Sequence, residues 1–166
     1  MFNTTQETFP VPFLGGDAFD PTFLSIAKPV YDAPATPPPD LASLTTLNQL
    51  RGHVSAISIC AVFHCFDTEE AQIHLARAIA SLLSPQPGSM IIGFQAARPE
   101  NEAGTVIQET SDGKELRMFY FSPSRWTELW DGGIFEKGTV KVEAKLAPYT
   151  FRGNNIDYLV WCVTRL

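Results

Sequence analysis

Residues 54–94 read VSAISICAVFHCFDTEEAQIHLARAIASLLSPQPGSMIIGF, and this stretch decides the fold class of the chain. The run over 54–63 is nearly all apolar or small, which is typical of a central strand covered on both faces in a parallel sheet. Apolar residues then recur at helical spacing over 68–83, with Asp67 as the expected N-cap. The apolar run over 89–94 predicts the next strand, reached by a right-handed crossover. The stretch therefore predicts an α/β protein.

The C-terminal part of the chain predicts a short helix followed by a pair of strands. The helix is expected to begin at Ser122-Pro123, because proline is favoured in the first helical turn. Residues 140–146 alternate between apolar and polar side chains, as a half-exposed strand does, and 156–163 is their expected antiparallel partner. Between the two parts, the polar composition of 96–114 predicts a mobile loop.

The N-terminal third is expected to be mostly irregular. Residues 1–10 are polar and predicted to be disordered, whereas the apolar run over 11–14 predicts a short buried strand. Asp20 stands directly before a proline, as the cap of a helical turn does. The proline-rich segment 29–40 favours an extended surface connector, because proline lacks the backbone donor that helices and central strands need. We expect residues 11–166 to form a single domain.

Composition and charge restrict the classes of partner. The chain of 166 residues has a net charge of −6 without any cluster of Lys or Arg, which argues against binding to nucleic acid or to an anionic membrane. No apolar run approaches the length of a membrane span, and we expect a cytoplasmic protein. Cys60, Cys65 and Cys162 are expected to be buried free thiols. Since His64 and Cys65 are adjacent rather than spaced like zinc ligands, no metal is expected.

One histidine and one glycine turn are the first candidates for a functional site. His64 follows the strand predicted over 54–63, at the carboxyl edge where α/β proteins bind ligands. It could act as a general base or orient a substrate, and a structural role as a loop histidine bonded to the backbone is equally compatible with its position. The turn over 15–20, GGDAFD, ends an apolar run in an acidic tip, which is typical of a nucleotide-cofactor domain. It lacks the G-x-G-x-x-G spacing that holds a cofactor phosphate.

Four aromatic residues are the candidates for an apolar substrate pocket, which would take a small hydrophobic metabolite. They are Phe119, Phe121, Trp126 and Trp130. Trp126 and Trp130 are spaced four apart in the helix expected after Ser122, so they share one face of it. Aromatic residues at helical spacing are more often plain core, and both roles remain open at this point.

Several longer runs together resemble the S-adenosylmethionine-dependent methyltransferases of fungal secondary-metabolite gene clusters, including those that tailor meroterpenoids and polyketides. The runs are PFLGGDAFDPTFL (12–24), LTTLNQLRGHVSAI (44–57), FHCFDTEEAQIHLARAIASLLSPQPGSMIIG (63–93), FSPSRWTELWDGGIFEKGTVKVEA (121–144) and LVWCVTRL (159–166). They cover most of residues 11–166 in order. The resemblance implies a Rossmann-like, class I methyltransferase fold that ends in an antiparallel hairpin.

The resemblance also implies S-adenosylmethionine as the cofactor, with Asp17 and Ala18 as its adenine contacts. Members of this family begin with two strands, an intervening helix and a glycine-rich turn, and the resemblance implies that these are missing here. Contacts to the adenine alone give little affinity. We therefore expect a truncated domain that methylates a small hydrophobic acceptor only when a partner completes the cofactor site or the site is rebuilt.

The missing strands would leave the strand over 54–63 with an unpaired apolar edge, which is prone to aggregation. We expect this edge to be covered by self-association into a homo-oligomer, by a rearranged N-terminal strand or by a second protein chain. Two other functions remain open. The inherited pocket could serve a cofactor-independent cyclase or isomerase, or the chain could be a non-catalytic binding subunit.

Overall fold

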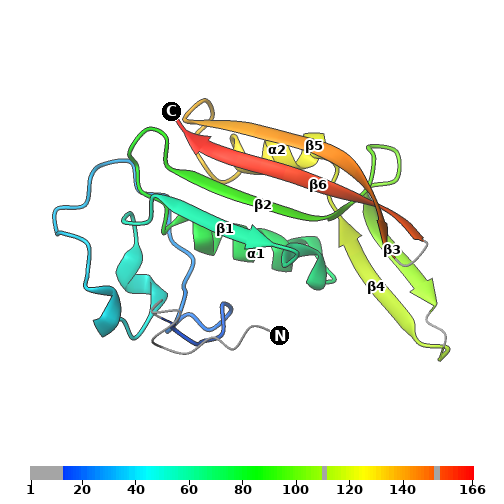
Figure 1. The fold of residues 1–166 in the computed structure, drawn as a ribbon, viewed down its shortest axis with the longest axis horizontal. Helices are drawn as coiled ribbons and strands as arrows, with labels where there is room; N and C mark the ends of the chain where they lie inside the picture. Colours follow the sequence, from blue (N-terminus) through cyan, green and yellow to red (C-terminus); the bar gives the residue numbers. More distant parts are fainter. Residues whose placement is uncertain (1–12, 110–111, 152–153) are drawn as a thin grey trace.

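The computed structural model describes residues 13–109, 112–151 and 154–166, which form two β-sheets and helices on one side of the larger sheet (Figure 1). The larger sheet has four strands in the order β1-β2-β6-β5, and a separate two-stranded sheet pairs β3 with β4. The strands of the larger sheet are β1 (Ala56–Cys60), β2 (Met90–Ala97), β5 (Val140–Phe151) and β6 (Asn154–Arg165). The smaller sheet is the hairpin of β3 (Gly104–Glu109) and β4 (Glu115–Tyr120), which projects from one end of the molecule.

The larger sheet is mixed. Strands β1 and β2 are parallel, while β6 runs antiparallel to both β2 and β5. The predicted α/β class and the closing antiparallel hairpin are thus confirmed, and the turn of that hairpin, residues 152–153, lies outside the described residues. The Rossmann-like detail and the two missing strands stay predictions.

Helix α1 (Glu69–Ala80) makes the crossover between the two parallel strands. Its N-cap is Thr68, whose side chain accepts a hydrogen bond from the backbone N–H of Ala71 at 3.2 Å. The prediction of Asp67 as the cap was wrong by one residue, because Thr68 is the residue with extended backbone angles and a hydroxyl within reach of the first turn. Acidic Glu69 and Glu70 follow in the first turn, where their negative charges interact favourably with the positive end of the helix dipole and stabilise the helix.

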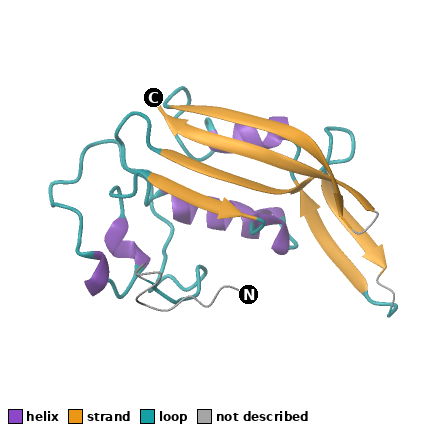
Figure 2. Ribbon diagram, viewed as in Figure 1, coloured by secondary structure: helices purple, strands orange, loops and turns teal. Residues whose placement is uncertain are grey.

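One face of the larger sheet carries the hydrophobic core. Helix α1 and the shorter α2 (Pro123–Trp130) pack on this face (Figure 2). Ser122 is the N-cap of α2 and Pro123 its first residue, as predicted. The core joins inward side chains of the strands to those of both helices; its fully buried members include Ile91, Leu159, Val163, Ala78, Trp126 and Trp130.

The opposite face of the larger sheet is open. Along β2, the inward residues are buried, whereas Met90, Ile92 and Phe94 are 36%, 40% and 38% exposed. The prediction of a central strand covered on both faces was wrong for β1, which lies at the sheet edge and alternates between exposed and half-buried residues. Burial of the thiols was wrong too, since Cys60 and Cys65 are exposed. For β1 and Cys60 the cause is the same, since helices cover one face of the described sheet, whereas Cys65 lies in the short helix after β1.

The N-terminal part is irregular apart from the short 3-10 helices η1 (Leu41–Ser43) and η2 (Leu47–Leu50). The predicted turn at Asp20 is confirmed: its carboxylate accepts from the backbone N–H of Thr22 at 2.8 Å. Residues 29–40 contain no helix or strand, as predicted. The predicted strand over 11–14 was wrong where it can be tested, since residues 13 and 14 are in no strand. Its first two residues, like the region 1–10, lie outside the described residues.

The prediction of a mobile loop over 96–114 was wrong for part of the segment. The segment contains β3, which pairs with β4 in a regular antiparallel register from Gly104 opposite Tyr120 to Glu109 opposite Glu115. The polar composition hid this strand because both faces of the hairpin are largely exposed, including Ile107 at 60%. No helix among the described residues combines the length and the apolar composition that crossing a lipid bilayer requires.

Candidate functional site

The carboxyl end of β1 leads directly to His64, and the turn of Asp17 and Ala18 packs on the segment that follows His64. Strand β1 ends at Cys60, opposite Phe94, while β2 continues to Ala97. Directly after β1, Ala61 has a φ of 57°, a left-handed conformation that is uncommon for a residue with a side chain. Its N–H donates to the carbonyl of Phe94 at 2.7 Å. The chain therefore turns sharply away from the sheet at its carboxyl edge, where α/β proteins bind ligands.

The 3-10 helix η3 (Phe63–Cys65) follows this turn and sets His64 beside the exposed end of β2. The backbone N–H of Ala96 donates to Nδ1 of His64 at 3.3 Å, so the neutral imidazole carries its own proton on Nε2. Burial lowers the pKa of His64 from 6.5, which favours this neutral form. Of the roles left open, the backbone-bonded one is thus observed. A general base acting through Nε2 would need the other tautomer and would lose the bond from Ala96, whereas Nε2–H is a ready donor.

Asp17 and Ala18 lie in a tight turn packed against the segment that follows His64. One carboxylate oxygen of Asp17 accepts from the N–H of Phe19 at 2.9 Å, and its carbonyl accepts from the N–H of Asp20 at 3.1 Å. The ring of Phe19 lies 4.8 Å from that of Phe66, centroid to centroid. The structure therefore brings the Asp17 turn to the segment that begins with His64.

The residues present fit part of the implied cofactor. The Asp17 side chain is exposed and can accept from the exocyclic amine of an adenine, while half-buried Ala18 and Phe19 offer an apolar surface beside it. Gly15 and Gly16 do not make a cofactor-cradling turn, so these residues supply no match for the methionine end. Among the described residues, no group of three or more His, Cys, Asp or Glu side chains is arranged to hold a metal ion.

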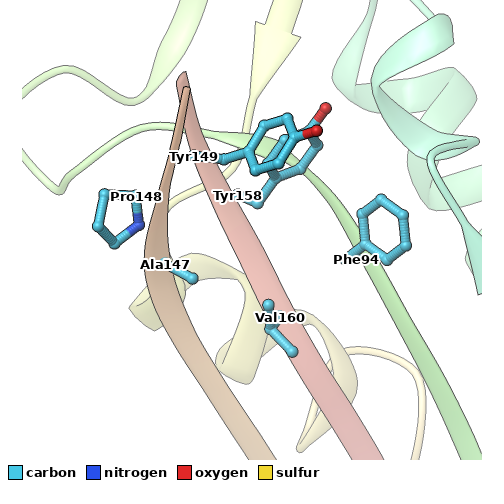
Figure 3. Close-up of a pocket in the computed structure, with 6 residues that line it drawn as sticks. All are labelled: Phe94, Ala147, Pro148, Tyr149, Tyr158 and Val160. Atoms are coloured by element: carbon cyan, nitrogen blue, oxygen red, sulfur yellow. The ribbon is translucent and has the colours of Figure 1, made fainter. Parts of the chain in front are cut away.

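An apolar pocket opens on the uncovered face of the sheet, at the same end as the carboxyl edge of β1 (Figure 3). Its volume is about 490 Å³, and its lining residues come from β2, β5 and β6: Phe94, Ala147, Pro148, Tyr149, Tyr158 and Val160. The ring of Tyr158 lies 5.5 Å from that of Phe94 and 5.2 Å from that of Tyr149, both nearly perpendicular to it. The pocket is thus an aromatic corner beside the end of β1, on the side of the sheet away from α2.

The four predicted pocket residues lie elsewhere, in the core on the covered face. Their side chains are at most 5% exposed. Their rings form a continuous row: Phe119 to Phe121 at 5.1 Å, Phe121 to Trp126 at 5.1 Å and Trp126 to Trp130 at 5.7 Å. This burial favours the alternative of plain core residues, while a role in a substrate pocket stays a prediction. The open aromatic pocket was missed because the run over 54–63 was interpreted as a strand of a sheet that is covered on both faces.

Comparisons with known proteins identify relatives of this chain. No family model matches the chain. It is 41% identical over 85 residues to the asnovolin E/chermesin D methyltransferase of Aspergillus novofumigatus, a match that covers 51% of this chain and 28% of that protein. It is 31% identical over 93 residues to the O-methyltransferase phiE of a fungal species, covering 56% of this chain and 29% of that protein. The predicted resemblance to fungal secondary-metabolite methyltransferases is confirmed.

A longer match involves the methyltransferase prhM of Penicillium brasilianum, with 27% identity over 126 residues, 71% of this chain and 43% of that protein. The matched region thus makes up less than half of each of these curated relatives. More than half of the length of each of these relatives lies outside its match to this chain.

Proposed function

We propose that this protein takes part in S-adenosylmethionine-dependent methyl transfer to a small hydrophobic acceptor in fungal secondary metabolism, with a cofactor site that a partner completes. The observation that carries the proposal is the place of His64, which is bonded to Ala96 of β2, two residues along that strand from Phe94 of the open aromatic pocket. The turn of Asp17 and Ala18 packs through Phe19 on Phe66, two residues after His64. The similarity to named fungal methyltransferases supports the reaction class.

The aromatic pocket suits the acceptor better than the four core aromatics do. Its volume of about 490 Å³ lies within the usual range for small-molecule sites, and its lining is mostly apolar, with the hydroxyls of Tyr149 and Tyr158 as polar groups. The rings of Phe94 and Tyr158 meet nearly at right angles, which offers an edge and a face to a fused-ring or isoprenoid ligand. None of the lining residues belongs to the buried core, so a substrate in this pocket displaces no core side chain.

Methyl transfer depends mainly on alignment of the acceptor atom with the donor methyl, so positioning is the main contribution of the protein. Bound S-adenosylmethionine would supply the electrophilic methyl group. Asp17 would hold the adenine amine at the turn. Nε2–H of His64 would donate to an acceptor oxygen and orient its lone pair, while Nδ1 stays fixed by the N–H of Ala96. An acceptor with an acidic proton would release it to solvent, which requires no general base.

The test combines cofactor binding with product analysis. S-adenosylmethionine is titrated calorimetrically into this chain alone and into this chain co-purified with the N-terminal segment of the Aspergillus relative. Isotope-labelled methyl transfer to a panel of apolar acceptors with hydroxyl or carboxyl groups is then measured. We expect binding and transfer with the completed protein only. The proposal would be overturned if no combination of chains bound the cofactor or transferred a methyl group. Acceptor isomerisation without the cofactor would instead identify a cyclase or isomerase.

A substitution at the adenine turn gives the matching prediction. We expect Asp17→Asn to weaken S-adenosylmethionine binding by the completed protein about 10-fold or more, because a charged acceptor is replaced by a neutral one. Asp40→Asn is the control, since the Asp40 carboxylate makes a comparable bond to the backbone N–H of Ala42 at 3.0 Å, far along the chain from the site. Equal loss in both variants would remove Asp17 from the proposed site.

A further inference from the structure

The open face of the sheet is apolar on β2 and β6. On β2 it shows Met90, Ile92 and Phe94, and on β6 it shows Val160, which is 41% exposed. A large sheet with a parallel pair of strands is normally covered on both faces, because crossover helices pack on each side. Here the described crossover, α1, lies on the core face. The exposed apolar face therefore has the character of an interior surface whose cover is a separate layer of protein.

The free edge of β1 borders this face directly. The carbonyl of Ser55 accepts from the N–H of Met90, and the N–H of Ala61 donates to the carbonyl of Phe94. Since backbone groups alternate between the two sides of a strand, the odd-numbered residues of β1 bond to β2, and Ala56, Ser58 and Cys60 direct their N–H and C=O groups outward. Strand β2 is the sole strand neighbour of β1 among the described residues.

We propose that the free edge of β1 and the open face together form one docking surface for a second polypeptide, which adds a parallel strand beside β1 and packs a helix over Ile92 and Phe94. This partner is the cofactor-binding part of a methyltransferase, and in that respect the inference rests on the proposed function. A partner of the α/β class accounts for both features at once, because such proteins pair parallel strands and cover both faces of the sheet with helices.

The size of the relatives and the charges at the rim support this occupant. Most of the length of each matched relative lies outside the match, which is enough chain for such a layer. On the first half of β5, the open face is charged, with Lys141 bound to Glu143 at 3.0 Å and both side chains well exposed. The docking surface should therefore cover β1, β2 and β6 and end at this charged half of β5, as an apolar interface core ends at a polar rim.

A second copy of this chain suits the surface less well. Two copies joined edge to edge through β1 would satisfy the outward backbone groups of Ala56, Ser58 and Cys60. Their sheets would then be continuous, but no helix would be placed over Ile92, Phe94 and Val160. A homodimer is therefore an outcome that the experiment must be able to detect.

The experiment co-expresses the full chain with the N-terminal segment of the Aspergillus relative and measures complex mass by light scattering and affinity by titration. We expect a one-to-one complex in which hydrogen exchange slows at residues 56, 58 and 60. Ile92→Lys should weaken it about 30-fold or more, the size of effect expected at an interface hot spot. Ile107→Lys, the same change at a more exposed strand position on the hairpin, should leave the affinity within about 3-fold.

Three results would overturn the inference: no complex when both chains are soluble, equal loss in both variants, or a homodimer of this chain that Ile92→Lys dissociates. The outcome is separable from that of the proposed function. A complex that depends on Ile92 but transfers no methyl group would support the docking surface and contradict the reaction. Methyl transfer by this chain alone would support the reaction and contradict the need for a docked partner.

Discussion

The two faces of the larger sheet are built from the same strands but differ in what covers them. Ile91 and Ile92 are consecutive residues of β2, and their exposed fractions are 0% and 40%. On one side, α1 and α2 complete a core of close-packed aromatic and aliphatic side chains. On the other, equally apolar side chains meet no layer of the described structure. The comparison shows that one apolar face is covered and the other is exposed in the described structure, and the proposed docking surface predicts that a partner covers the second.

The largest expected difference between the faces comes from removing one phenylalanine on each side. Phe121 is 1% exposed and Phe94 is 38% exposed. We expect Phe121→Ala to lower the free energy of unfolding by about 3–5 kcal/mol, because it leaves a cavity in the aromatic row. Phe94→Ala should change it by less than about 1 kcal/mol, because that ring already contacts solvent. Urea denaturation of both variants, followed by tryptophan fluorescence, gives the two values.

The same pair of variants also tests the role of the open face. A loss above about 2 kcal/mol for Phe94→Ala in the isolated chain would mean that the open face is already covered there, for instance by self-association. The unfolding midpoint of each variant is therefore measured at two protein concentrations. A midpoint that rises with concentration would identify that association.

Much of the covered half could be predicted from the sequence, because local patterns determine it. The helical spacing of apolar residues predicted α1, the Ser-Pro pair predicted the start of α2, and strict alternation predicted β5. The open face could not be predicted. A short apolar run is consistent with burial on one face or on both, and only the arrangement of the other elements decides between them. The strand β3 was missed for the opposite reason, since both of its faces are polar or exposed.

The location of the candidate site could be predicted from the sequence, but the residues that line its pocket could not. The rule that ligands bind at the carboxyl edge of parallel strands identified His64, and the turn at Asp17 lies against the same segment. The aromatic residues near Trp126 were conspicuous in the sequence, but helical spacing placed them in the core. Tyr158 and Phe94 are remote in sequence and become neighbours only through the pairing of β2 with β6.

The edge of β1 gives a second, smaller contrast between two neighbouring residues. Ile57 bonds to β2, whereas the backbone of Ser58 faces the free edge. We expect Ile57→Pro to cost about 1–3 kcal/mol of unfolding free energy, because it leaves a sheet acceptor without its donor. Ser58→Pro should cost less, since proline is tolerated where the N–H faces away from the sheet. Thermal unfolding of the two variants, measured in parallel, checks the order.

If Ser58→Pro proved as damaging as Ile57→Pro, the outward direction assigned to the Ser58 backbone would be wrong. Ser58→Ala serves as the control for the lost hydroxyl, which lies 3.6 Å from the sulfur of Cys60. The same proline variant should also weaken docking of the second polypeptide while leaving the fold intact, which separates the edge from the face.

The smallest expected effect on stability concerns His64. Strand β1 ends at Cys60, and beyond this point the imidazole of His64 accepts the hydrogen bond from the N–H of Ala96 on β2. Burial lowers the pKa of this imidazole from 6.5, so the unfolded chain takes up a proton at higher pH than the folded chain does. The stability that neutral His64 contributes is therefore present above pH 6.5 and decreases as the pH falls towards the lowered pKa. Urea midpoints measured between about pH 8 and pH 5 should show this decline.

The variant His64→Gln should flatten that part of the profile, because its amide oxygen can still accept from the N–H of Ala96 but does not titrate in this range. His53→Gln removes an imidazole from the other end of β1 and serves as the control. An unchanged profile in His64→Gln would show that His64 contributes nothing to the pH dependence. Retention of the midpoint at pH 8 would show that the accepted hydrogen bond, rather than the imidazole itself, holds the carboxyl edge of β1 against β2, as the geometry of Nδ1 requires.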